Sequence, residues 1–377
     1  MADLSHLQDY LDPVSVSALT EDGAFHDCQF AQQILHHDQS FPDLEDTHIV
    51  LVGLQDHRGE GFLSENNASD LIRRHFYPMY HWHPDLRLAD IGNLRSGASL
   101  QDTHASLKGL LSELLEAGKT VVILGGSHDF TLAQYQAYAS RGQIVEASVI
   151  DALIDLQEES GVPARSFLME MLTGQPNFLK HYNHIGFQSY FIHPRMLETL
   201  DKLRFDCYRL GLVREQLEDM EPVLRASHML SVDIQAIRPA EAPANRLSPN
   251  GLAGDEACAL MRYAGMSAQL NSLGIYGYQP ALDREELTAL QLAQMLWYFI
   301  EGKALARKEA LLQERDSFWE FHLSFSDMET SFLKSKRTGR WWMQLPNQQF
   351  IPCAYTDYLT ATKNEIPERW LRAQERI

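Results

Sequence analysis

The stretch Thr120–Phe130, TVVILGGSHDF, joins an apolar, β-branched run to two glycines and then to three polar side chains. Such a run is typical of a buried strand, because β-branched residues pack well on a pleated surface. The two glycines let the backbone turn tightly and place Ser127, His128 and Asp129 at the end of the strand. A helical pattern follows over residues 130–140. The stretch therefore predicts a strand, a polar turn and a helix, which is the repeating unit of a parallel sheet.

The same alternation of strand and helix extends over most of the chain. Eight strands are predicted, at residues 47–54, 86–91, 120–124, 147–150, 184–187, 207–210, 228–232 and 272–276. Helical patterns lie between them, for example at residues 100–117, 130–140 and 287–302. Strands that alternate with helices form parallel sheets with helices on both faces. We therefore predict an α/β fold of three layers, α/β/α, around a mostly parallel eight-stranded sheet.

The pattern changes near Lys303, where a charged helical stretch leads to the aromatic, proline-containing sequence RWWMQLPNQQFIPCAY. At 377 residues, 45% of them apolar, the chain can bury one large core. We predict one α/β domain over residues 1–302 and a C-terminal appendage over residues 303–377, packed on the same domain or forming an oligomer contact.

Charge and cysteine usage limit the possible partners and compartments. The chain has 32 Lys and Arg against 51 Asp and Glu, a formal net charge of -19, which opposes binding to nucleic acid or to an anionic membrane. The N-terminal residues lack the pattern of a signal peptide, and no 18 apolar residues run together, so we expect a soluble protein that does not span a membrane. Four cysteines without CxxC spacing predict neither disulfides nor a zinc knuckle, and favour the cytoplasm.

Polar residues follow three of the predicted strands. GGSHDF follows the strand at 120–124, DALID spans Asp151–Asp155, and DIQAIRPAEAP begins at Asp233. Because ligands bind where the carboxyl ends of parallel strands meet, these loops could form one cleft for a small molecule. One imidazole among several carboxylates is a donor set that hard divalent cations such as Mn²⁺ favour. Each residue alone could equally cap a helix or a turn, so only their joint order indicates a shared site.

In that order on an α/β chain, GGSHD, DALID and SVDIQAIRPAEAPAN resemble the three metal loops of the arginase, or ureohydrolase, family, which includes agmatinase and formimidoylglutamase. The segment GLQDHRGEGFLSENNASDLIRRHF, residues 53–76, also matches. SGVPARSF, residues 160–167, and IGFQ, residues 185–188, are most similar to the formimidoylglutamase branch. The resemblance implies an arginase-like fold, self-association into a homo-oligomer, and a binuclear manganese centre that hydrolyses C–N bonds in linear amidines.

The resemblance also implies ligands for each of the two Mn²⁺ ions. Asp151 and Asp233 match the two aspartates that bridge both ions. His128 and Asp155 match the remaining ligands of the first ion. All four ligand positions of the first ion are therefore filled.

The positions that belong to the second ion alone are changed. Leu153 and Gln235 stand where the family has a histidine and an aspartate. An alkyl side chain has no lone pair, and a neutral amide is a weaker ligand for a hard cation than a carboxylate. Gly277 matches the family glutamate that binds the cationic substrate, and Ser127 replaces an aspartate that supports the metal-binding histidine. We therefore predict that the second metal site is incomplete and that a cationic substrate binds more weakly.

Several states and functions remain open at this point. The first site could hold one divalent ion, or hold none with its acids protonated or paired with His128⁺ or Arg238; two bound ions are least favoured. We favour a pseudoenzyme of the arginase family with a decayed manganese centre, weak or inactive on amidines. The alternatives are an active formimidoylglutamase-like hydrolase that uses one metal, and a non-catalytic structural or partner-binding subunit.

Overall fold

A computed structural model describes residues 4–19, 25–63, 65–157, 161–325 and 328–376. Ser64 and Ser160, which belong to two of the matching segments, lie outside these described residues. The main sheet contains β1 Leu11–Asp12, β2 Leu35–His36, β3 Ile49–Leu54, β4 Leu88–Leu94, β5 Thr120–Leu124, β6 Val145–Ile150, β7 Leu179–Phe187, β8 Asp206–Arg209, β9 Met229–Asp233 and β10 Ser272–Tyr276.

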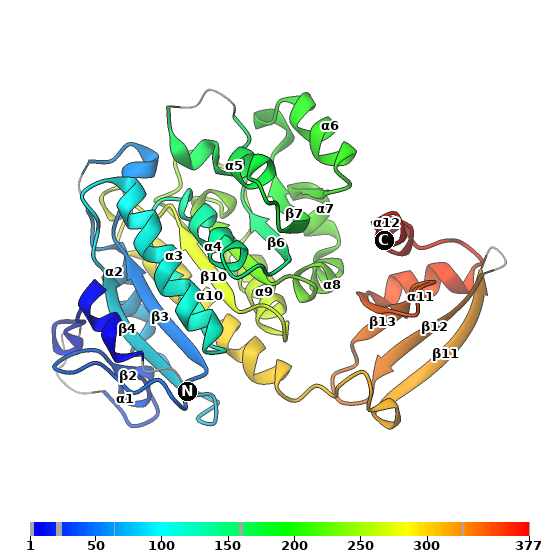
Figure 1. Cartoon of the computed structure of the whole chain (residues 1–377), viewed down its shortest axis with the longest axis horizontal. Helices are drawn as coiled ribbons and strands as arrows, with labels where there is room; N and C mark the ends of the chain where they lie inside the picture. Colours follow the sequence, from blue (N-terminus) through cyan, green and yellow to red (C-terminus); the bar gives the residue numbers. More distant parts are fainter. Residues whose placement is uncertain (1–3, 20–24, 64, 158–160, 326–327, 377) are drawn as a thin grey trace.

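The strand order across this sheet is β1-β4-β3-β5-β10-β9-β6-β7-β8, and the short β2 also pairs with β4 (Figure 1). The strands from β3 to β10 run parallel to their neighbours, whereas β1 is antiparallel to β4. All eight predicted strands are present, β5 and β10 with the predicted bounds. The two-residue strands β1 and β2 were not predicted, because so short a segment carries no periodic pattern.

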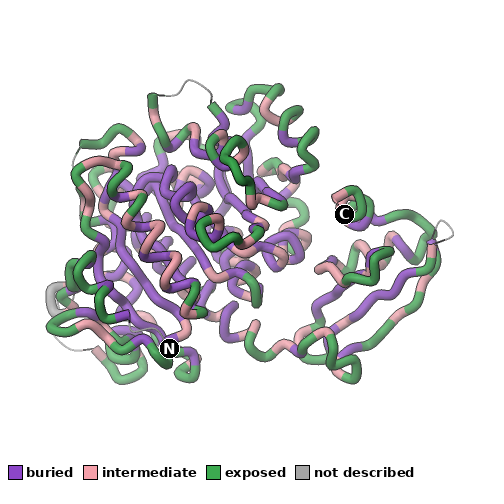
Figure 2. Tube along the Cα trace, viewed as in Figure 1, coloured by how far each residue is buried: buried purple, intermediate pink, exposed green. Residues whose placement is uncertain are grey.

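Helices cover both faces of the main sheet. They are α1 Phe30–Gln33, α2 Ala68–Phe76, α3 Leu100–Glu116, α4 Phe130–Ala139, α5 Phe167–Thr173, α6 Pro194–Lys202, α7 Leu210–Glu215, α8 Met220–Arg225, α9 Gly254–Gly265 and α10 Leu287–Ala306. Alternate residues of β3 point to opposite faces: Leu51 joins the core beneath α2, α9 and α10, and Val52 joins the core beneath α3, α4 and α5. The strands are buried from both sides (Figure 2), so the predicted three-layer α/β/α fold is confirmed.

One fully buried ion pair fixes α2 on the sheet. Arg73 of α2 donates from Nε and Nη2 to the two carboxylate oxygens of Asp90 in β4, at 2.8 and 2.9 Å, and both side chains are fully buried. Asp70 accepts a third bond from Arg73 at 3.0 Å, and Tyr77 donates to Asp90 at 2.8 Å. A buried charge is tolerated only when it is paired and hydrogen bonded in this way.

The C-terminal residues form a second sheet. Its strands are β11 Phe318–Phe325, β12 Met328–Ser335, β13 Trp341–Gln344 and β14 Phe350–Cys353, antiparallel in that order, followed by α11 Tyr355–Thr362 and α12 Glu368–Gln374. A separate cluster that includes Phe325, Phe332 and Trp370 forms its core. The sequence predicted a charged helix from about Lys303. In the structure only the end of α10, up to Ala306, is helical there, and turns lead from it to β11. The domain boundary between residues 302 and 303, which α10 crosses, stays a prediction.

The C-terminal part contacts the α/β body in two places: the second sheet contacts α8, and α12 contacts the edge strand β8. The guanidinium of Arg225 in α8 lies 4.3 Å from the ring centroid of Trp342 and donates to the Trp341 carbonyl at 2.8 Å. At the other end, Asp206 of β8 accepts from Arg372 at 2.7 Å and from Arg376 at 2.5 Å. The two bonds to Asp206 are charge-assisted, so they depend on the ionisation of Asp206.

Replacing Asp206 by asparagine is expected to loosen the C-terminal sheet. Burial alone would raise the pKa of Asp206, but the hydrogen bond from His181 and the charges of Arg376 and Arg372 lower it to about 2. Because the folded pKa lies below the unfolded one, this contribution is present above pH 4 and is lost as the pH falls toward 2. We expect Asp206→Asn to cost about 2 kcal/mol at pH 7, with faster proteolysis between residues 307 and 317.

A matched control is Asp201→Asn. Asp201 lies 3.9 Å from the same Arg372, but its side chain is 68% exposed, so we expect almost no change in stability or cleavage. Equal proteolysis of the two variants would show that Asp206 does not hold the sheet in place.

Candidate metal centre

Five neighbouring strands, β3, β5, β10, β9 and β6, end at the same edge of the main sheet. The loops that follow them are tied together by backbone hydrogen bonds: Gly125 donates to Ile275, and Gly277 donates to Gly126, both at 2.9 Å. Gly126 has φ +85°, and a Cβ there would lie 2.5 Å from the Leu54 side chain, so the turn requires glycine. This turn delivers His128 to the carboxyl edge, as the sequence predicted.

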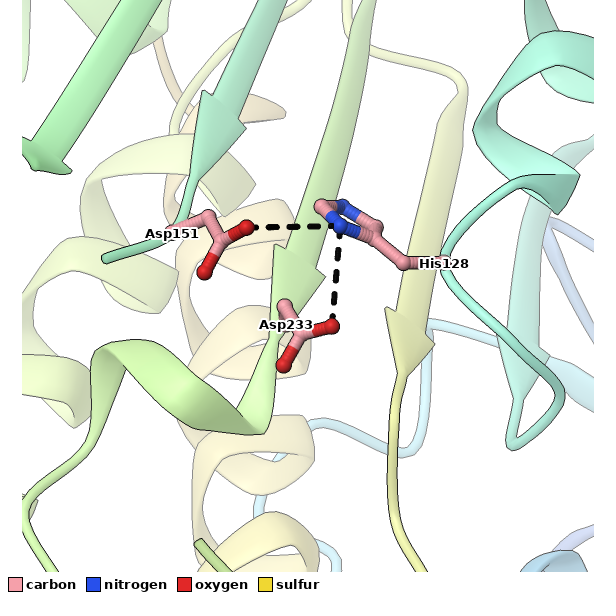
Figure 3. Close-up of side chains that lie close together, drawn as sticks. All are labelled: His128, Asp151 and Asp233. Carbon is pink, nitrogen blue, oxygen red and sulfur yellow. Dashed lines mark ion pairs between the residues drawn. The ribbon is translucent and has the colours of Figure 1, made fainter. Parts of the chain in front are cut away.

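The structure brings the four predicted ligands of the first ion together. The Nδ1 atom of His128 lies 3.1 Å from Asp155 Oδ2 and 3.5 Å from Oδ2 of both Asp151 and Asp233. Figure 3 shows His128 between Asp151 and Asp233; these three residues each offer a ligand atom within 4.8 Å of the others. All four side chains are buried.

Burial and mutual charge shift the ionisation of these groups. Burial raises the pKa of Asp151 to about 6 and that of Asp233 to about 7, and it also raises the pKa of Asp155. Burial alone would lower the pKa of His128, but hydrogen bonds to Asp151 and Asp155 and the charge of Asp233 raise it well above its usual range. Three buried carboxyl groups that resist ionisation thus surround one protonated imidazole, and a bound cation would favour their ionised forms.

His128 is oriented from behind by a hydroxyl that the sequence analysis did not single out. Its Nε2 atom is hydrogen bonded to Ser231 Oγ at 2.9 Å, and Ser231 shares a 2.6 Å bond with Thr131. Without a metal, Nδ1–H donates to the carboxylates; if Nε2 keeps its proton, Nδ1 can give that proton up and offer its lone pair to a bound cation. The loss of support predicted from Ser127 is therefore offset by Ser231.

The three changed positions lie around the same carboxylates and supply no charge. Leu153 is partly exposed. Gln235 contributes its backbone N–H, which donates to Asp233 Oδ1 at 2.7 Å. Gly277 has φ +78°, and a Cβ there would lie 2.8 Å from both carboxylate oxygens of Asp233, so a glutamate at this position would need the turn to move. Arg238 does not neutralise the acids, because it pairs with Glu241 at 2.7 Å.

The donor chemistry fits one divalent ion better than two. One imidazole nitrogen and three carboxylates converge, and the buried Asp151 Oδ1 atom has no protein hydrogen-bond partner. A second ion would have only the shared aspartates, since Leu153 and Gln235 add no anionic ligand. In the described part of the chain, His128, Asp151 and Asp233 are the only group of three potential ligands whose ligand atoms all lie within 4.8 Å of one another, and Asp155 Oδ2 lies 3.1 Å from the Nδ1 atom of His128.

The loop after β3 adds polar residues that were not predicted as site residues. Burial, together with the charges of Asp233 and Asp129, raises the pKa of Glu60 to about 8. Burial lowers the pKa of His57 to about 4, so its ring is neutral near pH 7. Asp129 accepts a 2.6 Å hydrogen bond from His104. The match of residues 53–76 to the family marked this loop, but no motif in it indicated that Glu60 is half-buried.

The fold and the site together define an α/β protein with a buried cluster of one histidine and three aspartates at the carboxyl edge of its sheet, of which His128, Asp151 and Asp233 could together hold a metal ion. The arginase family model matches residues 47–301, and the chain belongs to the arginase family. No helix in the described part of the chain has both the length and the apolar character needed to cross a membrane.

Similar proteins lie in the predicted branch. A formimidoylglutamase of Halalkalibacterium halodurans is 22% identical over 270 residues, which cover 66% of this chain and 83% of the relative. Trypanosoma cruzi formiminoglutamase, solved with Mn²⁺, superposes with a TM-score of 0.65 at 16% identity, over 73% of this chain and 98% of that one. Bacillus subtilis formimidoylglutamase gives a TM-score of 0.62 at 18% identity, over 69% and 88%. The predicted family is confirmed by the family model, and these similar proteins are formimidoylglutamases.

Proposed function

We propose that this protein is a formimidoylglutamase-like member of the arginase family that binds one divalent ion, such as Mn²⁺, at His128, Asp151, Asp155 and Asp233. It lacks the second ion of a binuclear centre and hydrolyses linear amidines weakly or not at all. One observation carries the proposal: the three carboxylates of the first-ion positions lie within 3.5 Å of the His128 Nδ1 atom, whereas Leu153 and Gln235 leave the second ion without ligands of its own.

The bound ion would act as a Lewis acid that lowers the pKa of water and polarises a C=N bond. The residues of the chain hold it in place: Ser231 orients His128, and the Gln235 N–H holds one oxygen of Asp233. A single dication balances only part of the charge of three carboxylates, so the site retains affinity for a cationic ligand. A small-molecule ligand in this cleft, a cytoplasmic location and a homo-oligomer remain parts of the proposal that follow from the sequence.

Metal analysis tests the proposal directly. Protein prepared with excess Mn²⁺ should retain close to one equivalent after gel filtration, because only one ligand set is complete. The double variant Leu153→His, Gln235→Asp should retain close to two equivalents, since it adds an imidazole and a carboxylate beside the shared aspartates. The matched control Leu153→Met, Gln235→Asn should stay at one.

Activity assays complete this test. Formimidoylglutamate, arginine and agmatine should each be hydrolysed at or near the background rate by the unmodified, Mn²⁺-loaded protein. Sustained turnover of any of them, or two equivalents of Mn²⁺ in the unmodified protein, would contradict the proposal of a decayed centre.

A further inference from the structure

The strand β11 leaves one long edge of the second sheet open. In the described part of the chain it pairs with β12 alone, and in Figure 1 it is the outermost strand, on the side away from the α/β body. β11 pairs with β12 at eight consecutive positions without a bulge, and its sequence FWEFHLSF contains no lysine, proline or glycine. Those are the features that usually stop an edge strand from pairing with another chain. β11 therefore remains free to pair.

The backbone groups of β11 alternate between β12 and the open edge. The Lys336 N–H donates to the Ser317 carbonyl at 2.9 Å, whereas the Ser335 N–H points the other way, to the Arg340 carbonyl at 2.9 Å. Hydrogen-bonded pairs alternate with non-hydrogen-bonded pairs in an antiparallel ladder. The odd-numbered residues of β11 therefore bond to β12. The N–H and C=O groups of the even-numbered residues in the range 318–324 point to the open edge, where they offer regularly spaced donors and acceptors.

A second β11 strand fits this edge in one register. In a twofold arrangement the strand lies antiparallel to its own copy, and even-numbered residues must lie opposite even-numbered residues, because only they face the edge. Pairing Glu320 with the partner's His322 meets this condition and overlaps the two strands over residues 318–324. A shift by two residues in either direction would place two Glu320 or two His322 side chains opposite each other. Charge therefore selects the first register.

The side chains along the edge suit this register. Glu320 and His322 are both exposed, and His322 Nδ1 is hydrogen bonded to Ser331 Oγ at 2.9 Å. When Ser331 donates this bond, Nε2 of His322 carries the proton and can donate to the carboxylate of the partner's Glu320. On the other face, Trp319 is 49% exposed and would lie opposite the partner's Leu323. Pairing would thus cover an aromatic ring that the single chain leaves in water.

We propose that β11 pairs with β11 of a second copy of this chain, antiparallel and about a twofold axis at Phe321, so that the two C-terminal sheets become one continuous sheet. This surface lies outside residues 47–301, which the family model matches. The inference therefore goes beyond the proposed function and does not depend on the metal centre.

Sedimentation of the full chain over a range of concentrations tests the pairing. His322→Glu places two glutamates opposite each other at both charged pairs, so it should weaken association at least about tenfold. Where the unmodified protein is fully associated, its mass should be twice that of the dissociated variant. Glu320→Lys should also weaken association, because the partner's His322 loses its acceptor. The control Glu365→Lys changes an exposed glutamate outside β11 and should associate normally.

A mixture of the two variants is the sharpest form of this test. When Glu320→Lys meets His322→Glu, the new lysine lies opposite the new glutamate, and the remaining His322 lies opposite the remaining Glu320. The equimolar mixture should therefore associate about as well as the unmodified protein, although each variant alone does not. Only the register with its axis at Phe321 predicts this rescue.

An engineered disulfide tests the same register. Phe321→Cys would place two cysteines opposite each other in a non-hydrogen-bonded pair, where the Cα atoms lie about 4.5 Å apart, close enough for a disulfide. Mild oxidation should give a covalent dimer. Leu323→Cys is the matched control: it faces the partner's Trp319 rather than its own copy, so it should remain a single chain on a denaturing gel. The unmodified protein accounts for any cross-linking through the exposed Cys28.

Three results would overturn the inference: equal masses of the unmodified protein and His322→Glu at every concentration, no rescue in the mixture, or equal cross-linking of Phe321→Cys and Leu323→Cys. The first of these is also the result expected if a different protein occupies the edge. All these variants should bind as much Mn²⁺ as the unmodified protein, so failure of the pairing leaves the metal count as a separate test of the proposed function.

Discussion

Replacing His128 by alanine is expected to weaken divalent-ion binding by more than about a hundredfold, since even supporting residues of metal ligands contribute about 10- to 100-fold. His128 is the only nitrogen donor among the four predicted ligands, and its ring lies between three carboxylates. Without it, the metal-free protein would bury three acids with no positive charge among them. Mn²⁺ titration followed by electron paramagnetic resonance measures the loss, and the melting temperature with and without Mn²⁺ shows its effect on stability.

Two further variants make this experiment specific. Ser231→Ala removes the hydroxyl bonded to His128 Nε2 and should lower Mn²⁺ affinity by about 10- to 100-fold. His81→Ala removes a buried histidine whose Nε2 binds the Leu86 carbonyl, far from the three carboxylates in the sequence and outside the metal-ligand group. We expect His81→Ala to lose stability but to bind Mn²⁺ normally. Mn²⁺ binding by His128→Ala at the affinity of the unmodified protein would disprove the assigned ligand set.

Replacing Arg73 by methionine is expected to cost about 3–5 kcal/mol of folding free energy, the usual loss when one partner of a buried ion pair is removed. Asp90 would keep its place in β4 but lose both guanidinium bonds, and Asn93 and the Gly92 carbonyl would lose further donors. Lysine should not rescue the variant, because an ammonium group cannot make the bidentate contact. Chemical denaturation measures the change.

The neighbouring Arg74 provides the control. It pairs with Glu286 at 3.1 Å, and both side chains are about one-third exposed, so Arg74→Met should cost less than about 1 kcal/mol. The double variant Arg73→Met, Asp90→Asn should recover part of the loss, because the remaining group is neutral. If Arg73→Met and Arg74→Met were equally stable, the buried pair would not hold α2 on the sheet.

Most strands of the main sheet and the four ligands of the first metal ion could be predicted from the sequence, because local signals mark them. β5 and β10 are short apolar runs with glycines directly after them or within them, so their ends are marked locally. His128, Asp151, Asp155 and Asp233 follow strand ends, where topology alone brings them to one edge.

The missed features depend on contacts between distant segments. The sequence indicates only an ordinary loop acid at Glu60; its half-buried position depends on Gly59, which packs against Asp129, 70 residues further along the chain. The sequence indicates only a polar strand residue at Ser231. It becomes a partner of His128 because β9, which carries Ser231, and β5, which precedes His128, lie on either side of β10 in the sheet. The C-terminal strands were not predicted because aromatic residues fall on both faces of β11, which hides the alternation of a strand.

The position of β10 has a consequence for the order of folding. β10 is the last strand of the main sheet to be synthesised, yet it lies at the centre, with Gly274 paired to Ile123 of β5 and to Ser231 of β9. Until it inserts, β5 and β9 keep open edges that invite pairing with other chains. The Gly277–Gly126 hydrogen bond also forms only then, so the loops that carry His128 and Asp233 become fixed late. The nascent chain should therefore depend on chaperones until β10 has emerged, and acquire its affinity for metal in the final step of folding.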